Sequence, residues 1–588
     1  MLFVIVAEIM ACAIRSSDNI FGIECNGKEK IITQLADDTT LFLKDEHSLR
    51  EVLNVINNFG THSGLKLNKE KSEAFWLDQE KPVKNLCNLK WSKSSVKCLG
   101  ILCKADTEDA INENFILKIK KLKTLLNMWS QRNLSLKGKV AVLRSIALPQ
   151  LIYVSTVLFT PEWVIKRVDK LLIDFLWSNK KHHVKKDVIC QDIEHRGLKA
   201  PHFESMIKAV KCTWIKRIRA ETFNNTELLK CFVQYKDFDV QTIIRFKLDP
   251  KFITFNSPFY EQIYRYWYEI YSTEPQNVQE ILRTELWHSK YILIDDKPAF
   301  FNTWCDYGIH FIGQIVDVNG RLFNKQQIEK KFNCILNHMD YNSITSAIPN
   351  SWKHRIKRNT QSSDEKDYSV RVHIQNAEKL LNELKCKDFY SEFVQKLYVK
   401  PKAESKWSEY LNVLSLDWKY HYKLPYLLCC ETAIQSFQYK LLHRFYPCNH
   451  MLAVWFKDES ELCDECNVET DTLEHFFHYC PDILNFWGEL ENWWYETFSI
   501  TLRLTTVDII FGLFNENKDK MLDIFNLCIL WGKWCISLCK QKERNLSITD
   551  FLCFLKCKLE TERVICTCNN TLKTFENRWS LLYDALCI

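Results

Sequence analysis

The sequence predicts a mostly helical α+β protein with several domains. Glycine and proline contribute only 13 residues each to a chain of 588, whereas together they make up roughly 12% of average proteins. So few turn-forming residues disfavour an all-β array and leave little room for disordered linkers. Hydrophobic residues reach 46% and charged residues 26% of the chain, which is enough apolar surface for large cores. At roughly 150 residues per domain, the length predicts about four domains.

The first expected element is a helix at the N-terminus. Residues 1–14 are apolar apart from Glu8. A signal peptide would begin with basic residues and would not carry a carboxylate inside its apolar run. We therefore predict a buried helix here. Elsewhere no stretch reaches 18 uninterrupted apolar residues, so we expect neither a membrane-spanning segment nor a membrane partner.

Three short strands are predicted over residues 20–43. Asn26 and Gly27 form a dipeptide preferred in tight hairpin turns. Asp37 and Asp38 then fall at a turn between two apolar β segments, where both carboxylates can lean toward one cleft. Adjacent carboxylates repel each other unless a cation bridges them, and hard oxygen ligands suit Mg²⁺. The alternative is an ordinary solvated turn, which is commoner for such a pair.

A helix follows this turn. Ser48 and Glu51 have the spacing of a capping box, and Gly64 is a candidate C-cap. The apolar positions between them recur with helical spacing. These positions are Leu49, Val52, Ile56 and Phe59.

Two further β elements are predicted after the helix. Residues 65–71 are expected to form a short strand that carries Lys69 and Lys71, and residues 95–101, which include Gly100, to form part of a hairpin. These elements follow the order of a polymerase palm, which is strand, carboxylate turn, strand, helix, glycine and lysine-bearing strand.

In this region the chain resembles the reverse transcriptases of non-LTR (LINE-type) retrotransposons. The matching runs are Leu35-Ala36-Asp37-Asp38, Ser63-Gly64-Leu65-Lys66-Leu67-Asn68 with Lys69 and Lys71, and Leu99-Gly100-Ile101. The resemblance implies an RNA-directed DNA polymerase in which Asp37 and Asp38 bind catalytic Mg²⁺. It also implies that the two lysines and the Gly100 hairpin face nucleic acid, with an RNA template and a DNA primer or target as partners.

Two departures from the family pattern bear on activity. Leu35 stands where the family has an aromatic residue beside the first aspartate. The family's third carboxylate lies on an upstream strand, and residues 1–8 resemble the helix after that strand. We therefore expect the fingers and the first catalytic aspartate to be missing, and the chain to be inactive as a polymerase on its own.

A basic block follows the first hundred residues. Between Ile116 and Arg219 there are 22 Lys and Arg against 7 Asp and Glu, so the block carries +15 inside a chain of net charge +6. Such a block is typical of a surface that faces a polyanion. The alternative is a solvated helix face.

The block begins with two predicted helices. Apolar residues recur at helical spacing from Ile111 to Trp129, and Lys118 and Lys121 lie mostly off that stripe. Ser135 is a candidate cap for a second helix. The cations expected on this second helix are Lys137, Lys139 and Arg144. Cationic faces with apolar backs are suited to a thumb that grips a primer–template backbone, and a plain helical hairpin is the alternative.

The middle of the chain, residues 221–450, is predicted to be a helical spacer without a catalytic constellation. Trp352 precedes a run of cations and could stack a base, although the end of a surface helix is the commoner meaning. The polar residues 359–367 are the best candidate linker. Lys440 and Arg444 lie in a run similar to the same family and are candidate RNA contacts.

A metal site is predicted near the C-terminus. Cys463, Cys466, His475 and Cys480 have the spacing C-x2-C-x8-H-x4-C. Four nitrogen and sulfur ligands make a closed, structural Zn²⁺ site. His478 is the competing ligand, but its arm to Cys480 is too short. The region resembles the zinc-binding C-terminus of LINE-type reverse transcriptases, which implies a role in engaging RNA or target.

These observations divide the chain into four expected parts. They are a partial palm of antiparallel strands plus a helix with a primer-grip-like hairpin (1–105), a basic helical thumb (106–220), a helical spacer (221–450) and a small zinc-binding helical region (451–588). The predicted function is a reverse transcriptase fragment, and the alternatives are a non-enzymatic RNA- or DNA-binding protein and a degraded reading frame. The 25 scattered cysteines suit a reducing compartment, either nucleus or cytoplasm.

Overall fold

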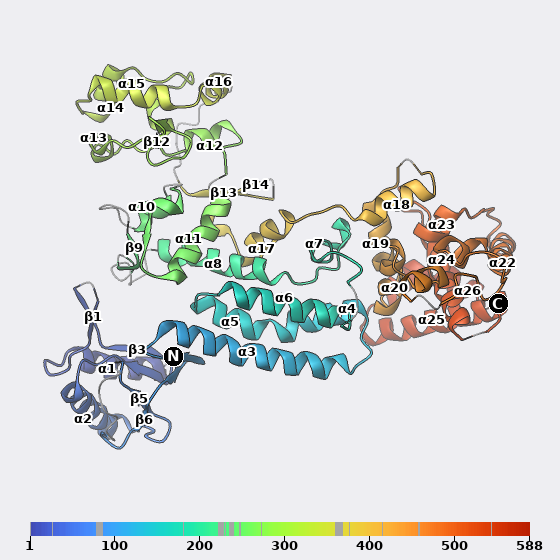
Figure 1. The fold of residues 1–588 in the computed structure, drawn as a ribbon, viewed down its shortest axis with the longest axis horizontal. Helices are drawn as coiled ribbons and strands as arrows, with labels where there is room; N and C mark the ends of the chain where they lie inside the picture. Colours follow the sequence, from blue (N-terminus) through green and yellow to red (C-terminus); the bar gives the residue numbers. More distant parts are fainter. Residues whose placement is uncertain are drawn as a thin grey trace. The chain divides into compact units, whose positions relative to one another are not determined.

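The fold was taken from a computed structural model of the chain (Figure 1). It describes residues 2–587 except 26, 78–85, 180–181, 221–228, 230, 235–239, 246–247, 272, 359–368, 376, 414, 457–458 and 543. The predicted turn residue Asn26 and the predicted linker 359–367 therefore lie outside the described residues.

The chain forms two compact units, and each unit draws on three separate segments. Unit 1 comprises Met1–Lys121, Gln150–Lys166 and Phe203–Phe393, and unit 2 comprises Leu122–Pro149, Arg167–His202 and Val394–Ile588. The four predicted parts are finer than these units, and their boundaries stay a prediction.

The N-terminal part of unit 1 gathers short strands around two helices (Figure 1). Its elements are α1 (Leu2–Arg15), β1 (Ile23–Cys25), β2 (Lys28–Lys30), β3 (Ile32–Leu35), β4 (Asp38–Leu41), α2 (Glu46–Ser63), β5 (Glu73–Phe75), β6 (Lys90–Ser92), β7 (Val96–Cys98) and β8 (Ile101–Cys103). Three antiparallel hairpins, β1–β2, β3–β4 and β7–β8, stand beside a parallel pair, β5–β6. Residues 20–43 thus hold four strands where three were predicted.

The helix α1 buries only one of its faces. Ala11 and Ile14 pack into a small core with Val52 of α2, whereas Val4 and Ile9 are 58% and 57% exposed. The prediction of a buried helix is therefore right for one face and wrong for the other.

The helix α2 confirms one predicted cap and corrects the other. Gly64 ends the helix with φ of 75°, a left-handed conformation that glycine adopts without a Cβ penalty. At the start, Asp45 is the N-cap, and its carboxylate accepts a hydrogen bond from the Ser48 backbone N–H. Ser48 is instead buried, and its hydroxyl accepts a hydrogen bond from Phe21 N at 3.0 Å.

The rest of unit 1 is largely helical around a core rich in tryptophan. Its elements are most of α3 (Thr107–Ser130), α5 (Pro149–Val157), the start of α6 (Glu162–Leu176), α8 (Phe203–Arg219), β9 (Val233–Gln234), α10 (Val240–Arg245), β10 (Thr254–Phe255), α11 (Pro258–Tyr271), α12 (Val278–Leu282), β11 (Leu293–Ile294), β12 (Lys297–Pro298), α13 (Asn302–Asp306), α14 (Lys325–Phe332), α15 (His338–Ala347), α16 (Asn350–Arg358), β13 (Arg371–Ile374), β14 (Ala377–Leu380) and most of α17 (Cys386–Gln395). Trp267, Trp287 and Trp304 are each at most 1% exposed. This core runs from Ala209 to Phe393.

The regular elements of unit 2 are all helices among its described residues, apart from an isolated β-bridge between Leu462 and Thr470. Its elements are the end of α3, α4 (Leu136–Val142) with a π-helical turn (Leu143–Ala147), the end of α6, α7 (Lys186–Ile189), α18 (Lys402–Tyr410), α19 (Trp418–Leu428), α20 (Thr432–Leu442), α21 (Asn449–Trp455), a second π-helical turn (His475–Tyr479), α22 (Pro481–Phe498), α23 (Thr506–Phe511), α24 (Lys520–Gln541), α25 (Ile548–Cys568) and α26 (Leu572–Ala585). One core joins residues from Ala403 to Leu582. None of the cysteines described is in a disulfide.

The helix α24 passes through the centre of that core. By length and composition it could cross a membrane, but 72% of its most apolar window is buried inside the protein. The bent pair formed by residues 136–147 and α5 passes the same test when it is taken as one segment.

Candidate functional site

The two predicted catalytic aspartates lie at the tip of the β3–β4 hairpin. Leu35 pairs with Asp38 at the last step of the ladder, so Ala36 and Asp37 form the turn. Ala36 has φ of 54°, in the left-handed region that tight hairpin turns require. Both carboxylates are exposed. They are hard oxygen donors of the kind Mg²⁺ accepts, and water or substrate phosphates would have to complete its coordination.

The predicted primer-grip hairpin β7–β8 contacts the β3–β4 hairpin two residue pairs away from this tip. The hydroxyl of Thr40, on β4, and the thiol of Cys98, on β7, are 3.3 Å apart. At the β7–β8 turn Leu99 and Gly100 both have positive φ, 46° and 83°, and Gly100 bears the conformation most easily. The structure therefore connects two elements that the sequence separates by 58 residues.

Two side chains hold this hairpin from the helices, and neither was singled out from the sequence. The Tyr153 hydroxyl, on α5, donates to the Leu99 carbonyl. Asn114, on α3, accepts from Leu102 N at 2.9 Å and donates to Leu102 O at 2.8 Å. Asn114 is only 4% exposed. Its place as a polar residue on the apolar face of a helix was the feature of the sequence that could have identified it.

Lys69 and Lys71 are exposed, but not on a strand. Residues 69–71 form a turn in which Lys71 N donates to the Asn68 side chain at 3.1 Å. The predicted strand over 65–71 is wrong, because the next strand begins only at Glu73. Ser72 also donates to the Asn68 carbonyl, from its N–H at 3.0 Å and from its hydroxyl at 2.8 Å. These local hydrogen bonds compete with strand pairing.

The predicted thumb helix α3 has the expected apolar stripe. Ile111, Phe115, Ile119, Leu122 and Leu126 are all buried. Off this stripe, Lys121 is exposed and Lys118 is half-buried. Both remain candidate phosphate contacts.

The second predicted thumb helix uses two of its lysines internally. Ser135 caps α4 as predicted, and its hydroxyl accepts from Gly138 N. Lys137 donates to the Gln435 side chain at 2.7 Å. Lys139 is 9% exposed and its ammonium donates to Ser178 Oγ at 2.5 Å. Burial lowers the pKa of Lys139.

The other candidate nucleic-acid contacts also include both exposed side chains and side chains that are buried or bonded within the protein. Arg144 is exposed, so it remains a candidate contact together with Lys121. Trp352 is 1% exposed and belongs to the core, so it cannot stack a base in this state. Arg444 bonds to the buried Glu474 at 2.8 Å and lies over Trp407.

The predicted zinc ligands converge in unit 2. The ligand atoms of Cys463, Cys466, His475 and Cys480 all lie within 4.8 Å of one another. Cys463 Sγ is 4.0 Å from Cys480 Sγ, and Cys466 Sγ is 3.4 Å from His475 Nε2. A tetrahedral site with Zn–S bonds of about 2.3 Å separates its ligand atoms by about 3.8 Å. The four side chains are therefore close enough together to hold a metal such as zinc after small shifts.

Local backbone geometry explains how the last two ligands meet. The side chains of residues five apart on an α-helix point about 140° away from each other. His475 and Cys480 could therefore not share a metal if both lay on a regular α-helix. The π-helical turn His475–Tyr479, closed by Cys480 N donating to His475 O at 3.1 Å, corrects this offset. His478 bonds instead to the Thr506 hydroxyl at 2.9 Å. The prediction of His475 over His478 agrees with this geometry.

The environment of the four side chains also suits a metal. Burial lowers the pKa of His475, which favours the neutral imidazole that binds metals. Backbone N–H groups of Glu469 and Val468 lower the pKa of Cys466. Burial, together with Cys463, raises the pKa of the Cys480 thiol to about 12 without metal, and a coordinated thiol is deprotonated outright.

Two charged residues outside the predicted set adjoin the cluster. The ammonium of Lys540, on α24, lies 3.8 Å from Cys463 Sγ and 4.1 Å from the centre of the Phe476 ring. Asp471, which is 2% exposed, lies 3.6 Å from the same ammonium. Lys540 comes 77 residues after Cys463, and no sequence signal connects them.

Comparison with known proteins gives a similarity to a transposon protein. No family model matches the chain. The chain is 24% identical over 193 residues to the "Transposon TX1 uncharacterized 149 kDa protein" of Xenopus laevis. The aligned segment is 32% of this chain and 14% of the frog protein. This similarity supports a transposon-related origin.

Proposed function

We propose that this chain is part of a non-LTR retrotransposon reverse transcriptase and that it binds a primed RNA template. The observation that carries the proposal is the Asp37–Asp38 hairpin, which lies bonded to the Gly100 hairpin through Thr40 and Cys98. The similarity to a transposon protein supports the same origin.

The chemistry proposed for the hairpin is nucleotidyl transfer with two metal ions. Two ions about 4 Å apart would activate the primer hydroxyl and stabilise the leaving pyrophosphate. Asp37 and Asp38 supply carboxylates for such ions, but among the described residues no third acidic, histidine or cysteine side chain joins them in a metal-binding group. We therefore propose that the chain alone binds nucleic acid without extending a primer.

Binding is proposed to use the exposed cations of the basic block. Lys121, in unit 1, and Arg144, in unit 2, are exposed and are each proposed as a separate phosphate contact. Lys137 and Lys139 bond to other protein groups and are not proposed as contacts. Contacts to phosphates are independent of base sequence and weaken as salt rises, because binding releases counterions.

The test is a salt titration of the full chain against a primed RNA. The variants Lys121→Ala and Arg144→Ala are each expected to weaken binding and to reduce the salt slope by about one. Lys387→Ala, which removes an exposed lysine in α17 outside the block, is the matched control. Equal salt slopes for all four proteins would contradict the two proposed contacts.

A nucleotide-incorporation assay on the same complex tests the catalytic part. We expect no incorporation above background from the chain alone, and unchanged RNA binding in Asp37→Asn. Template-dependent incorporation would show that two carboxylates suffice. If binding persists but an added upstream palm segment restores no activity, the chain is a non-enzymatic RNA- or DNA-binding protein.

A further inference from the structure

The helix α16, in unit 1, has one buried face and one strongly cationic face. Trp352 and Ile356 are 1% and 3% exposed and belong to the core of the unit. Four cations occupy other positions of the helix, three of them exposed and the first half-buried. They are Lys353, Arg355, Lys357 and Arg358. At neutral pH these four side chains, which we call the α16 cations, carry a charge of about +4.

The α16 cations have no carboxylate partner. Within the part of the chain that the structure describes, no ion pair joins any of them to an aspartate or glutamate. Lys353 donates to the neutral Asn350 side chain at 3.4 Å. Burial and the neighbouring Lys357 charge lower the pKa of Lys353. The charges of this helix therefore repel one another and are not neutralised by the protein.

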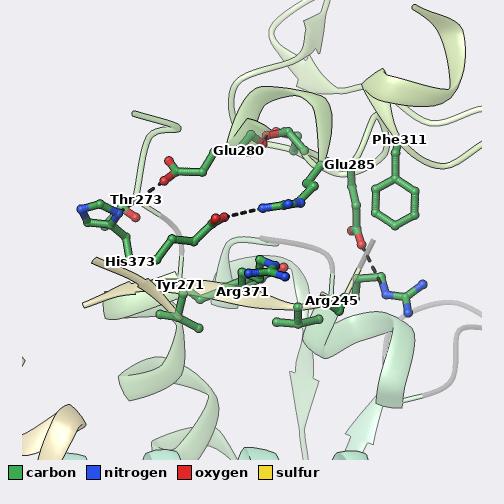
Figure 2. Close-up of a pocket in the computed structure, with 15 residues that line it drawn as sticks. Arg245, Tyr271, Thr273, Glu280, Glu285, Phe311, Arg371 and His373 are labelled. Carbon is green, nitrogen blue, oxygen red and sulfur yellow. Dashed lines mark hydrogen bonds and ion pairs between the residues drawn. The ribbon is translucent and has the colours of Figure 1, made fainter. Parts of the chain in front are cut away.

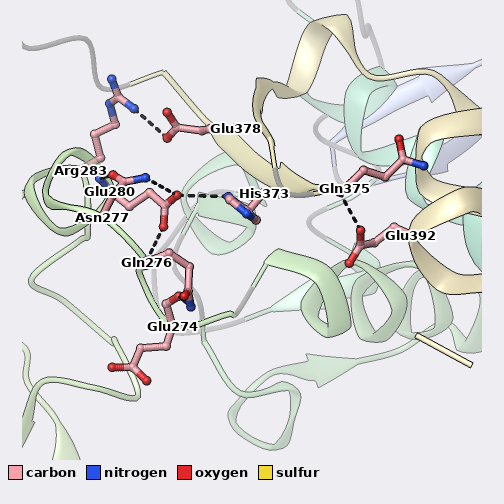
Figure 3. A network of polar contacts seen from close by, with 9 residues as sticks. All are labelled: Glu274, Gln276, Asn277, Glu280, Arg283, His373, Gln375, Glu378 and Glu392. Carbon is pink, nitrogen blue, oxygen red and sulfur yellow. Dashed lines mark hydrogen bonds and ion pairs between the residues drawn. The ribbon is translucent and has the colours of Figure 1, made fainter. Parts of the chain in front are cut away.

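The carboxylates of an element that packs against α16 have other partners. That element is α12, which lies in the segment 273–289 that lines a cavity (Figure 2). In this segment Glu285 lies 3.6 Å from Arg245. Glu280 accepts a hydrogen bond from Gln276 N at 2.6 Å and lies 3.3 Å from His373, as Figure 3 shows. None of the described residues that line the cavity belongs to α16.

Stabilisation of the helix itself accounts for only part of this charge. Cations in the last turn of a helix interact favourably with the helix dipole, and three of the α16 cations lie in that turn. Lys353 comes before it. Like charges three or four residues apart destabilise a helix, and Lys353 with Lys357 and Arg355 with Arg358 have this spacing. An external anion would relieve both repulsions.

The other exposed positions of α16 indicate the kind of anion. They are Asn350, Ser351 and His354, and no large apolar side chain of this helix is exposed. A helix that binds a membrane surface inserts an apolar face, and protein interfaces are anchored by aromatic and apolar side chains. Contacts to the phosphates of a nucleic acid need only cations and polar donors.

We propose that the α16 cations bind the sugar–phosphate backbone of a nucleic acid. The planar guanidinium groups of Arg355 and Arg358 can donate paired hydrogen bonds to phosphate oxygens, and Lys357 adds a point charge. The inference rests on the proposed function in taking a nucleic acid as the ligand. It adds a contact outside the basic block, in the segment predicted to be a spacer. The backbone can belong to RNA or to duplex DNA.

Salt titrations of the full chain against a primed RNA and against duplex DNA test this surface. The triple variant Arg355→Gln, Lys357→Gln and Arg358→Gln is expected to lower the salt slope by about two to three, because each phosphate contact contributes about 0.7 to 0.9. A slope lowered by about two corresponds to about 40-fold weaker binding at 0.15 M salt, since the counterion contribution vanishes near 1 M.

Two control variants separate the proposed contact from other effects. Lys251→Gln, Lys330→Gln and Lys387→Gln together remove three exposed lysines from other parts of unit 1, so this protein has the same change in net charge. Arg355→Lys with Arg358→Lys keeps all the charges of α16 and is expected to keep the wild-type salt slope. The proposal is overturned if the triple variant of α16 has the slope of the lysine control, or if the charge-conserving variant loses as much slope as the triple variant.

Lys121→Ala and Arg144→Ala, measured in the same titrations, distinguish this inference from the contacts proposed for the basic block. Loss of slope in the α16 triple variant alone supports the α16 surface and contradicts those two contacts. Loss of slope in Lys121→Ala or Arg144→Ala alone contradicts the α16 surface and leaves the proposed function standing. Absence of binding of both nucleic acids to the wild type overturns both.

The two probes also identify the source of the backbone. A slope lowered only for the primed RNA assigns the surface to RNA, and a slope lowered only for duplex DNA assigns it to DNA. If both slopes are unchanged in the triple variant while its binding to poly-L-glutamate is weakened, the surface serves an acidic protein and the proposal is overturned.

Discussion

The ammonium of Lys540 offers a direct test of the zinc centre, because it reaches the cluster from a helix that is distant in sequence. It lies 3.8 Å from Cys463 Sγ and 3.6 Å from Asp471 Oδ1, and its side chain is 12% exposed. Three thiolates, a neutral imidazole and Zn²⁺ carry a net charge of −1. Lys540 therefore faces two negative groups, the loaded centre and Asp471.

The Lys540→Met variant removes this charge and retains an apolar side chain against Phe476. With a Zn–S bond of about 2.3 Å, the ammonium lies at most about 6 Å from the metal. At an effective dielectric constant of about 20, the attraction at that distance is about 3 kcal/mol. Loss of residues next to metal ligands typically weakens binding 10- to 100-fold, or by about 1.4–2.8 kcal/mol. We expect a loss in this range.

Zinc affinity is measured by competition with a chromophoric chelator, using the full chain. Lys542→Met is the control, because it removes an exposed lysine two residues further along at the end of the same helix. Wild-type affinity in Lys540→Met, or an equal loss in Lys542→Met, would refute the electrostatic argument.

Three other substitutions test separate parts of the structure. Cys466→Ser should reduce bound zinc from about one per chain to a trace, as measured by elemental analysis; unchanged zinc content would remove Cys466 from the site. Asn114→Ala leaves the N–H and C=O of Leu102 without their partner, so unfolding in urea should become easier by about 2 kcal/mol, and an unchanged midpoint would argue against this attachment. Burial holds the pKa of His443 at about 4, while its ring bonds to the Arg196 carbonyl at 3.1 Å. In the unfolded chain His443 binds a proton near pH 6.5, whereas in the folded chain it stays neutral down to about pH 4. The free energy of unfolding therefore falls as the pH falls. Between pH 7 and pH 5 the loss is about 2 kcal/mol, and His443→Gln should be less acid-sensitive in urea unfolding at the two pH values.

Features encoded within a short stretch were predictable. The apolar stripe of α3 and the Ser135 cap of α4 follow from the spacing of neighbouring residues, and both are present. The group of three cysteines and one histidine that could hold a metal was also predictable, because all four fall within 18 residues of one another. The N-cap of α2 was predicted at Ser48 but lies three residues earlier, at Asp45. Both residue types are favoured N-caps, so local spacing alone did not identify the right one.

The lysines show where prediction from the sequence stops. Lys121 and Lys139 belong to the same basic block, yet one is exposed and the other is buried against Ser178. A long aliphatic stem lets lysine follow an apolar surface, so the helical position alone does not say whether its charge reaches solvent.

The sequence by itself determined the helical character of the chain, its basic block and the four residues of the candidate metal site, because periodicity, composition and close spacing act over a few turns. Only the tertiary structure decided that Thr40 meets Cys98, that Asn114 holds the Gly100 hairpin and that Lys540 faces Cys463. The cavity of unit 1 that Arg245, Glu285 and Arg371 help to line is of the same kind, since its residues come from segments separated by more than a hundred positions. Such contacts depend on how whole elements pack, and packing follows from the summed burial of many side chains rather than from any local pattern.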